Sequence, residues 1–215
     1  GNLVSLTTLD GGDGNDEINI TVPQGNDETS FVDGGAGDDT INAEIHMANA
    51  LSSADPVLSG GPGSDQFNLT VTPLAHPDLQ KDAEDGVFPP PPMTRIDDFE
   101  PGNDQLHIDP GSDDAPDEGL TFSEARVVET EDGTDVYLCY DATEDDAAYE
   151  ARIHLAGVTG LTLDDLSFGE EPGRVVFETN AGDTVTSGAG DDNVAVAGNG
   201  VFDGGGGDDT ISVLD

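Results

Sequence analysis

Five nine-residue segments of the chain place glycines and one carboxylate at the same spacing, and residues of these types at this spacing can hold a metal ion. The segments begin at residues 11, 34, 60, 187 and 204 and follow the form G-G-x-G-x-D-x-U-x, in which U is a large apolar residue. Only Ser187 departs from the glycine positions. Three glycines in four positions permit positive φ angles, so that backbone carbonyls can turn towards a small ion.

Calcium is the metal that this pattern predicts. Carbonyl and carboxylate oxygens are hard ligands suited to calcium, whereas zinc and copper sites use His and Cys, which none of the five segments contains. The predicted ligands lie at the sixth, second and fourth positions of each segment. They are Asp16, Asp39, Asp65, Asp192 and Asp209, together with Gly12, Gly14, Gly35, Gly37, Gly61, Gly63, Gly188, Gly190, Gly205 and Gly207.

A strand with period-two apolar residues follows each segment. Ile41, Ala43 and Ile45 alternate with polar residues after the second segment, and Ile211 and Val213 do so after the fifth. No single turn of chain could bury such a row, but stacked turns could. The sequence therefore predicts a narrow core between two sheets of parallel strands.

The five segments are similar to the nonapeptide repeats of the RTX (repeats-in-toxin, hemolysin-type) calcium-binding family. The resemblance implies an all-β fold built as a parallel β-roll, with calcium bound between successive motif turns. Neighbouring motifs then give about three or four ions. Two sites come from the first three motifs and one from the last two, and a fourth forms between the turns at 60–65 and 187–192 if the two groups stack directly.

A gap of more than one hundred residues separates the third motif from the fourth, and it predicts an insertion. We expect a β-roll N-terminal segment at 1–71, an inserted β-rich lobe at 72–169 and a β-roll C-terminal segment at 170–215. Within the lobe, residues 94–109 indicate two short strands around a turn. Residues 125–141 indicate a hairpin through the turn E-D-G-T-D.

The charge of the chain restricts its partners. The 215 residues include 47 Asp and Glu against five Lys and Arg, for a formal net charge of −42. Such a chain repels nucleic acid and anionic membranes, and we expect neither binding to nucleic acid nor insertion into a membrane. The chain also contains no HExxH, GxSxG or GxxxxGK[ST] motif, so no enzymatic activity is predicted for it.

These observations favour a calcium-binding module of a secreted bacterial protein, a monomer that folds outside the cell when calcium is present. Two alternatives stay open. One is a carbohydrate or surface adhesion module, with a glycan or a cell-surface ligand as its partner. The other is a non-catalytic appendage of a secreted polysaccharide-active enzyme, whose catalytic domain would lie outside this chain.

Overall fold

The computed structural model describes residues 8–22, 29–46, 56–72, 93–111, 120–142, 148–169, 174–179 and 184–214. In these ranges the chain is almost entirely strand and turn, with one 3-10 helix at Leu163–Asp165. No helix in the described ranges is long and apolar enough to cross a membrane. The predicted all-β class is confirmed, and most strand pairs are parallel.

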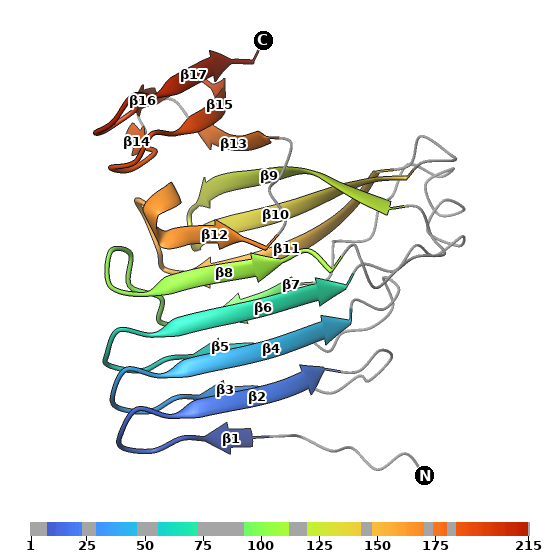
Figure 1. Ribbon diagram of the computed structural model, residues 1–215, viewed down its shortest axis with the longest axis vertical. Coiled ribbons are helices and arrows are strands. Elements are labelled where there is room, and N and C mark those ends of the chain that lie inside the picture. The colour runs from blue at the N-terminus through green and yellow to red at the C-terminus, as the bar shows by residue number, and fades with distance from the viewer. Residues whose placement is uncertain are drawn as a thin grey trace.

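One sheet has ten strands and runs the length of the molecule (Figure 1). Its strands, in spatial order, are β1 (Thr8–Asp10), β3 (Phe31–Asp33), β5 (Val57–Ser59), β7 (Met93–Ile96), β11 (Ala148–Ala156), β10 (Gly133–Ala142), β9 (Leu120–Thr130), β13 (Arg174–Thr179), β15 (Asn193–Gly198) and β17 (Thr210–Val213). Only β10 is antiparallel to its neighbours. The turn between β9 and β10 confirms the hairpin predicted at 125–141.

The other strands form two smaller parallel sheets. The five-stranded sheet consists of β12 (Leu166–Phe168), β8 (Gln105–Asp109), β6 (Gln66–Thr72), β4 (Thr40–His46) and β2 (Glu17–Val22), in that order. The two-stranded sheet consists of β14 (Thr184–Thr186) and β16 (Val201–Asp203). The two larger sheets lie one behind the other over the lower part of Figure 1.

Besides the short turn at 199–200, seven described turns carry the chain from one sheet to another. We number them turn 1 (11–16), turn 2 (34–39), turn 3 (60–65), turn 4 (97–104), turn 5 (157–165), turn 6 (187–192) and turn 7 (204–209). A rung is one such turn with the strand on either side of it. Because the strand orders are β1-β3-β5-β7-β11 and β2-β4-β6-β8-β12, the first five rungs stack in chain order.

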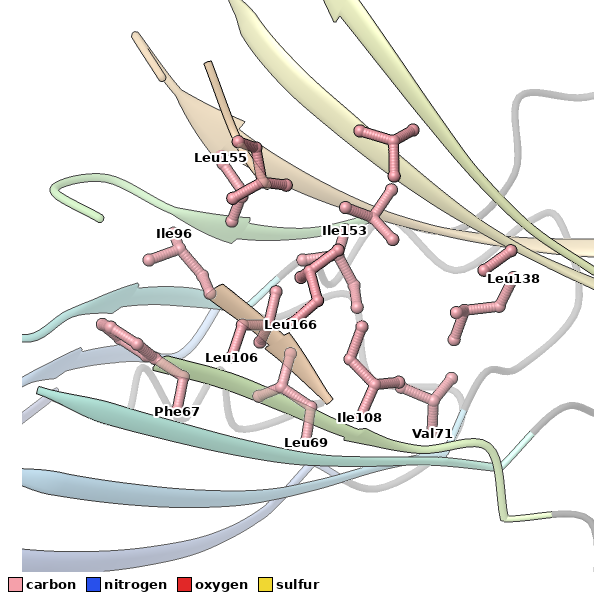
Figure 2. Close-up of a cluster of buried hydrophobic side chains, with 14 of the residues drawn as sticks. Phe67, Leu69, Val71, Ile96, Leu106, Ile108, Leu138, Ile153, Leu155 and Leu166 are labelled. Carbon is pink, nitrogen blue, oxygen red and sulfur yellow. The ribbon is translucent and has the colours of Figure 1, made fainter. Parts of the chain in front are cut away.

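Apolar side chains fill the space between the two large sheets. Ile41 lies opposite Phe67 in the register of β4 and β6, and both are fully buried. Figure 2 shows Phe67 and Leu106 of the five-stranded sheet facing Ile96 of the ten-stranded sheet. The period-two rows after the second and third motifs are therefore confirmed as core residues, and their burial holds successive rungs in register.

Residues 93–109, which the sequence placed in the inserted lobe, pair with the rungs before them. Strand β7 is parallel to β5 and β8 is parallel to β6, so these residues form a fourth rung. Strands β11 and β12 add a fifth rung in the same way. The hairpin of β9 and β10 then extends the ten-stranded sheet towards β13.

Rungs 6 and 7, which follow β13 in the chain, contribute a different strand to the ten-stranded sheet than rungs 1 to 5 do. In rungs 1 to 5 the strand before the turn belongs to that sheet, whereas in rungs 6 and 7 it is the strand after the turn, β15 or β17. Strand β17 is the last of the sheet. Its Ile211 and Val213 were predicted to be core residues, but they are 44% and 77% exposed because no strand in the described part of the chain covers their outer side.

Turn stacking gives a first prediction. Gly12 and Gly61 have similar φ angles, 95° and 91°, but a Cβ on Gly12 would meet nothing, whereas one on Gly61 would overlap the carbonyl oxygen of Gly35. Gly12→Ala should cost about 1–2 kcal/mol for its backbone conformation. Gly61→Ala should cost a further 1–3 kcal/mol or so, because the turns must move apart. Urea unfolding in millimolar calcium measures both, and equal losses would contradict direct backbone stacking.

Candidate metal centre

The motif turns stack backbone on backbone, and glycine makes this possible. Gly35 and Gly37 have φ angles of 101° and 136°, which L side chains rarely adopt. A Cβ on Gly35 would overlap the carbonyl oxygen of Gly12, and one on Gly37 would overlap that of Gly14. Any larger residue at these positions would separate the turns, so the glycines fix the spacing of whatever lies between them.

One hydrogen bond repeats between successive motif turns. The backbone N–H of Asp16 donates to Oδ1 of Asp39 (2.7 Å), and the N–H of Asp39 donates to Oδ1 of Asp65 (2.8 Å). The same bond joins the N–H of Asp192 to Oδ1 of Asp209 (3.1 Å). One oxygen of each accepting carboxylate therefore receives a charge-assisted hydrogen bond from the turn before it.

The other carboxylate oxygen is buried without a donor. Oδ2 of Asp16, Asp39, Asp65 and Asp192 is closed off from solvent and makes no hydrogen bond to any described residue. Asp39 and Asp65 are only 1% and 2% exposed. An unsatisfied buried acceptor costs about 1–3 kcal/mol, and more when it is charged. Four of the five predicted aspartates thus place uncompensated negative charge at one repeated position.

These oxygens converge with backbone oxygens of the next turn. A Cβ built on Gly34 would lie 2.6 Å from Oδ2 of Asp39 and 2.7 Å from the carbonyl oxygen of Gly60. A Cβ on Gly11 would likewise meet Oδ2 of Asp16 and the carbonyl oxygen of Gly34. Two acceptors therefore face one space beside Gly11 and beside Gly34, the first glycines of the first two motifs. A small cation is a species that satisfies both.

Turns 4 and 5 lack the glycine motif, and protein donors satisfy their carboxylates. Oδ1 of Asp104 continues the series by accepting the N–H of the turn 3 aspartate (2.9 Å), but Oδ2 accepts the N–H of Glu100 (2.8 Å). In turn 5, Oδ1 of Asp165 accepts the N–H of Gly102 (2.6 Å), and Oδ2 accepts both the N–H and the hydroxyl of Thr162. Both oxygens of each of these two carboxylates therefore accept hydrogen bonds from the protein, and neither carboxylate needs a cation.

Burial makes the Asp65 carboxylate difficult to ionise. The pKa of Asp65 is raised from 3.8 to about 6, chiefly by burial, and nearby carboxylates contribute further repulsion. The pKa of Asp104, in the next turn, is also raised, again chiefly by burial. A cation beside Asp65 would favour its ionised form, because an opposite charge within a few ångströms offsets the loss of hydration.

Turn 6 carries Ser187 where the other motifs have their first glycine. This residue is fully buried, and its hydroxyl donates to the carbonyl oxygen of Gly204 at 2.9 Å. The equivalent carbonyl oxygen between turns 2 and 3, that of Gly60, faces Oδ2 of Asp39 instead. The serine therefore occupies one of the two acceptors between turns 6 and 7, while Oδ2 of Asp192 still lacks a donor.

The metal ligands were predicted in the five motif turns, and the stacking of turn 4 on turn 3 was not predicted. The structure brings the predicted residues of turns 1 to 3 into one column and those of turns 6 and 7 into another. Asp98 of turn 4 belongs beside turn 3, because its carboxylate accepts the N–H groups of Gly60 (3.0 Å) and Gly61 (2.7 Å). The signal was present in the sequence G-N-D-Q-L at 102–106, which repeats the G-x-D-x-U half of the motif.

Turn 3 does not stack on turn 6, so the junction suggested for a fourth ion does not exist. Turn 6 instead contacts turn 5, where the N–H of Leu163 donates to the carbonyl oxygen of Ser187 and the N–H of Ala189 donates to Asp164, both at 2.7 Å. Two rungs and the hairpin lie between the segments. The buried Oδ2 of Asp65, next to turn 4, marks a fourth position in another place.

A second cluster of ionisable residues lies on the ten-stranded sheet and is closed. His154 Nδ1 is 2.7 Å from Oδ1 of Asp135, and Oδ2 of Asp135 accepts a hydrogen bond from the Tyr137 hydroxyl (3.3 Å). Arg152 lies 3.6 Å from the same Oδ2. Both oxygens of this buried carboxylate therefore have protein partners, in contrast to the aspartates of the motif turns.

Comparison of the chain with protein-family models, with curated proteins and with solved structures gives no match. Among the described residues, no group of three or more His, Cys, Asp or Glu side chains is arranged to hold a metal by side chains alone. The candidate centre is of another kind, since it combines one carboxylate of a turn with backbone oxygens of the next.

Asp39→Asn tests whether the buried negative charge of Asp39 opposes the stacking of the turns when calcium is absent. The amide keeps an oxygen for the N–H of Asp16 and can place its NH2 towards the carbonyl oxygen of Gly60. We expect a larger folded fraction than wild type in a chelator and a smaller gain from calcium, both measured by urea unfolding. Asp132→Asn, which removes the same charge from an exposed turn, is the control. A change of the same sign and size in both variants would indicate bulk charge alone.

Ser187→Gly tests the space between turns 6 and 7. Removing the hydroxyl frees the carbonyl oxygen of Gly204, and one hydrogen bond is worth about 0.5–1.5 kcal/mol, so calcium should bind there about two- to tenfold more tightly. Ser187→Ala, which frees the carbonyl but keeps a methyl group in the space, should give a smaller gain. Competition against a chromophoric chelator measures both, and an unchanged or weaker affinity in Ser187→Gly would contradict this assignment.

Proposed function

We propose that the chain is a calcium-binding β-roll module of the RTX kind, whose motif turns bind calcium ions between them. The observation that carries the proposal is the Oδ2 atom of Asp16, Asp39, Asp65 and Asp192, buried without a donor at the same place in four turns. A protein that gained nothing from cations would have little reason to repeat this cost. Turns 4 and 5 support the proposal by contrast, because they remove the cost with backbone donors.

Calcium suits the position better than other common cations. The acceptors are one carboxylate oxygen and backbone carbonyl oxygens, a set without nitrogen or sulfur. Calcium accepts six to eight oxygens at about 2.3–2.6 Å in irregular arrangements, whereas magnesium requires near-octahedral geometry at about 2.0–2.1 Å and gives up its water reluctantly. An ion bound between two peptide turns must lose much of its water, which favours calcium.

The proposed ions number four per chain, within the three or four expected from the sequence. Three would lie beside Asp16, Asp39 and Asp65, and one beside Asp192. At a hundredfold excess over its dissociation constant, each independent site adds roughly 2.7 kcal/mol to the free energy of unfolding. Four such sites are comparable to the whole stability of an ordinary domain, about 5–15 kcal/mol. Calcium would therefore decide whether the motif rungs fold.

Folding that depends on calcium suits a protein that works outside the cell. Extracellular calcium modules bind with dissociation constants of about 10⁻⁴–10⁻³ M, far above the calcium level of cytosol. With a formal charge of −42, the metal-free chain repels itself, which suits export in an open form. We propose a secreted, non-enzymatic module that closes its rungs when it meets millimolar calcium.

A calcium titration of the chelated protein tests the proposal. We expect chelation to remove the β signal of rungs 1–3, 6 and 7, and the region of turns 4 and 5 to keep part of its structure because protein donors satisfy its carboxylates. Millimolar calcium should restore the far-ultraviolet circular dichroism with four ions bound per chain by calorimetry. Magnesium at the same concentration should not. A chelated sample with unchanged dichroism and melting temperature would rule the proposal out.

A further inference from the structure

The carbonyl oxygen of the first motif residue points to the preceding turn in turns 2, 3, 6 and 7. Those of Gly34 and Gly60 face the spaces beside buried Oδ2 atoms. That of Ser187 accepts the N–H of Leu163 (2.7 Å), and that of Gly204 accepts the Ser187 hydroxyl (2.9 Å). In a planar trans peptide, the N–H points the opposite way from the carbonyl oxygen. The group that holds this N–H therefore decides where the oxygen points.

In turns 2 and 7, the aspartate directly before the glycines holds this N–H. Oδ1 of Asp33 accepts the N–H of Gly35 (3.2 Å), and Oδ1 of Asp203 accepts that of Gly205 (3.1 Å). Turn 3 has Ser59 at the same position. A serine hydroxyl carries no negative charge, so turn 3 lacks the carboxylate that these other motif turns use.

Asp98 of turn 4 supplies a carboxylate to turn 3. Its Oδ2 accepts the N–H of Gly61 and the hydroxyl of Ser59, both at 2.7 Å, and its Oδ1 accepts the N–H of Gly60 at 3.0 Å. These bonds are half-buried and charge-assisted. Because both oxygens have protein donors, Asp98 differs from Asp39, whose Oδ2 has none.

We propose that Asp98 is a positioning residue for calcium. By holding the N–H of Gly61, it directs the carbonyl oxygen of Gly60 at the ion beside Asp39. This inference rests on the proposed function, since it concerns the ion between turns 2 and 3. Glycine on both sides leaves the peptide free to rotate, and a rotated peptide would turn its N–H towards the cation. Turn 4, which lacks the glycine motif, thus prepares a site between two turns that have it.

Moving the carboxylate separates its position from its charge. Asp98→Ala removes the charge and all three hydrogen bonds. Adding Ser59→Asp returns the charge to the position that Asp33 has in turn 2, within reach of the N–H of Gly61. The stack accepts carboxylates at this position on successive turns, because Asp10 pairs with Asp33 in the register of β1 and β3.

Ser64→Asp, added to Asp98→Ala, is the matched control. It returns one negative charge to the same turn, at the position where turn 2 has Asp38. The side chain at this position points to turn 4, since the Ser64 hydroxyl donates to Oδ1 of Asn103 (2.8 Å). A carboxylate there restores the charge of turn 3 without holding the N–H that Asp98 holds.

The experiment is a calcium titration in which nuclear magnetic resonance follows single peptides. The protein is labelled with glycine that carries carbon-13 at its carbonyl and nitrogen-15 at its amide. A spectrum that correlates these two nuclei across the peptide bond shows only Gly–Gly peptides, which the chain has at 11–12, 34–35, 60–61 and 204–207. The peptide at 60–61 reports the ion beside Asp39, and the peptide at 34–35 reports the ion beside Asp16.

Asp98→Ala should raise the calcium concentration at the midpoint for the peptide at 60–61 by about tenfold, the loss expected for a hydrogen bond to a charged group. The midpoint for the peptide at 34–35 should rise less. Ser59→Asp should restore most of the lost affinity, and Ser64→Asp should not. Asp98→Asn, which keeps one oxygen for Gly61, should lie between wild type and Asp98→Ala, and it gives the comparison if Asp98→Ala does not fold.

Other results overturn the proposal. Equal recovery with Ser59→Asp and with Ser64→Asp would show that Asp98 acts through charge alone, and no recovery with either would separate its effect from the N–H of Gly61. An equal rise at both peptides would indicate a general loss of stability. If no peptide of the wild type responds to calcium, the proposed function itself fails. A normal wild-type response with an unchanged midpoint in Asp98→Ala would overturn only the role of Asp98.

Discussion

In turns 2 and 3, one oxygen of the motif carboxylate accepts a backbone N–H from the turn before it, while the other lies buried between the turns without a donor. The first oxygen draws neighbouring turns together, and the second opposes their approach through unpaired charge. Asp39 shows both effects, and the raised pKa of Asp65 reports the same burial in the next turn. Glycine lets the backbones come close enough for this conflict to arise.

The second carboxylate oxygen is treated differently in turns 4 and 5 than in the motif turns. In turns 4 and 5, backbone and hydroxyl groups complete the carboxylates of Asp104 and Asp165, so these rungs close with protein atoms alone. In four of the motif turns, no donor among the described residues bonds the second carboxylate oxygen. The apolar rows between the sheets are only two or three residues wide per strand, so their burial gives each rung limited stability. A cation at the motif turns would thus act on the rungs that most need it.

Periodicity in the sequence was enough to predict the strands and their core face. The alternation of Ile41, Ala43 and Ile45 gave the buried side of β4, and the G-G-x-G-x-D spacing located the turns. Tertiary pairing was harder to foresee. Turn 4 has two extra residues and only one glycine, so the G-N-D-Q-L sequence at 102–106 indicates a turn but does not show that β7 pairs with β5 and places this turn in the stack.

The sequence also did not predict that rungs 6 and 7 add the strand after the turn to the ten-stranded sheet. This arrangement follows from the position at which the hairpin of β9 and β10 extends that sheet towards β13. A motif describes its own turn and the strand after it but not the neighbour on which it will stack. For the same reason the exposure of Ile211 could not be predicted, since its counterpart Ile41 has nearly the same local sequence and is fully buried.

Anomalous diffraction from crystals grown in calcium tests most directly whether calcium binds between the motif turns. We expect peaks between successive turns, one beside Oδ2 of each of Asp16, Asp39, Asp65 and Asp192, and none between turns 4 and 5. Calcium found only on exposed carboxylates would contradict it. So would empty density between the motif turns, with the buried oxygens bonded to water, because the unpaired charge would then have another partner.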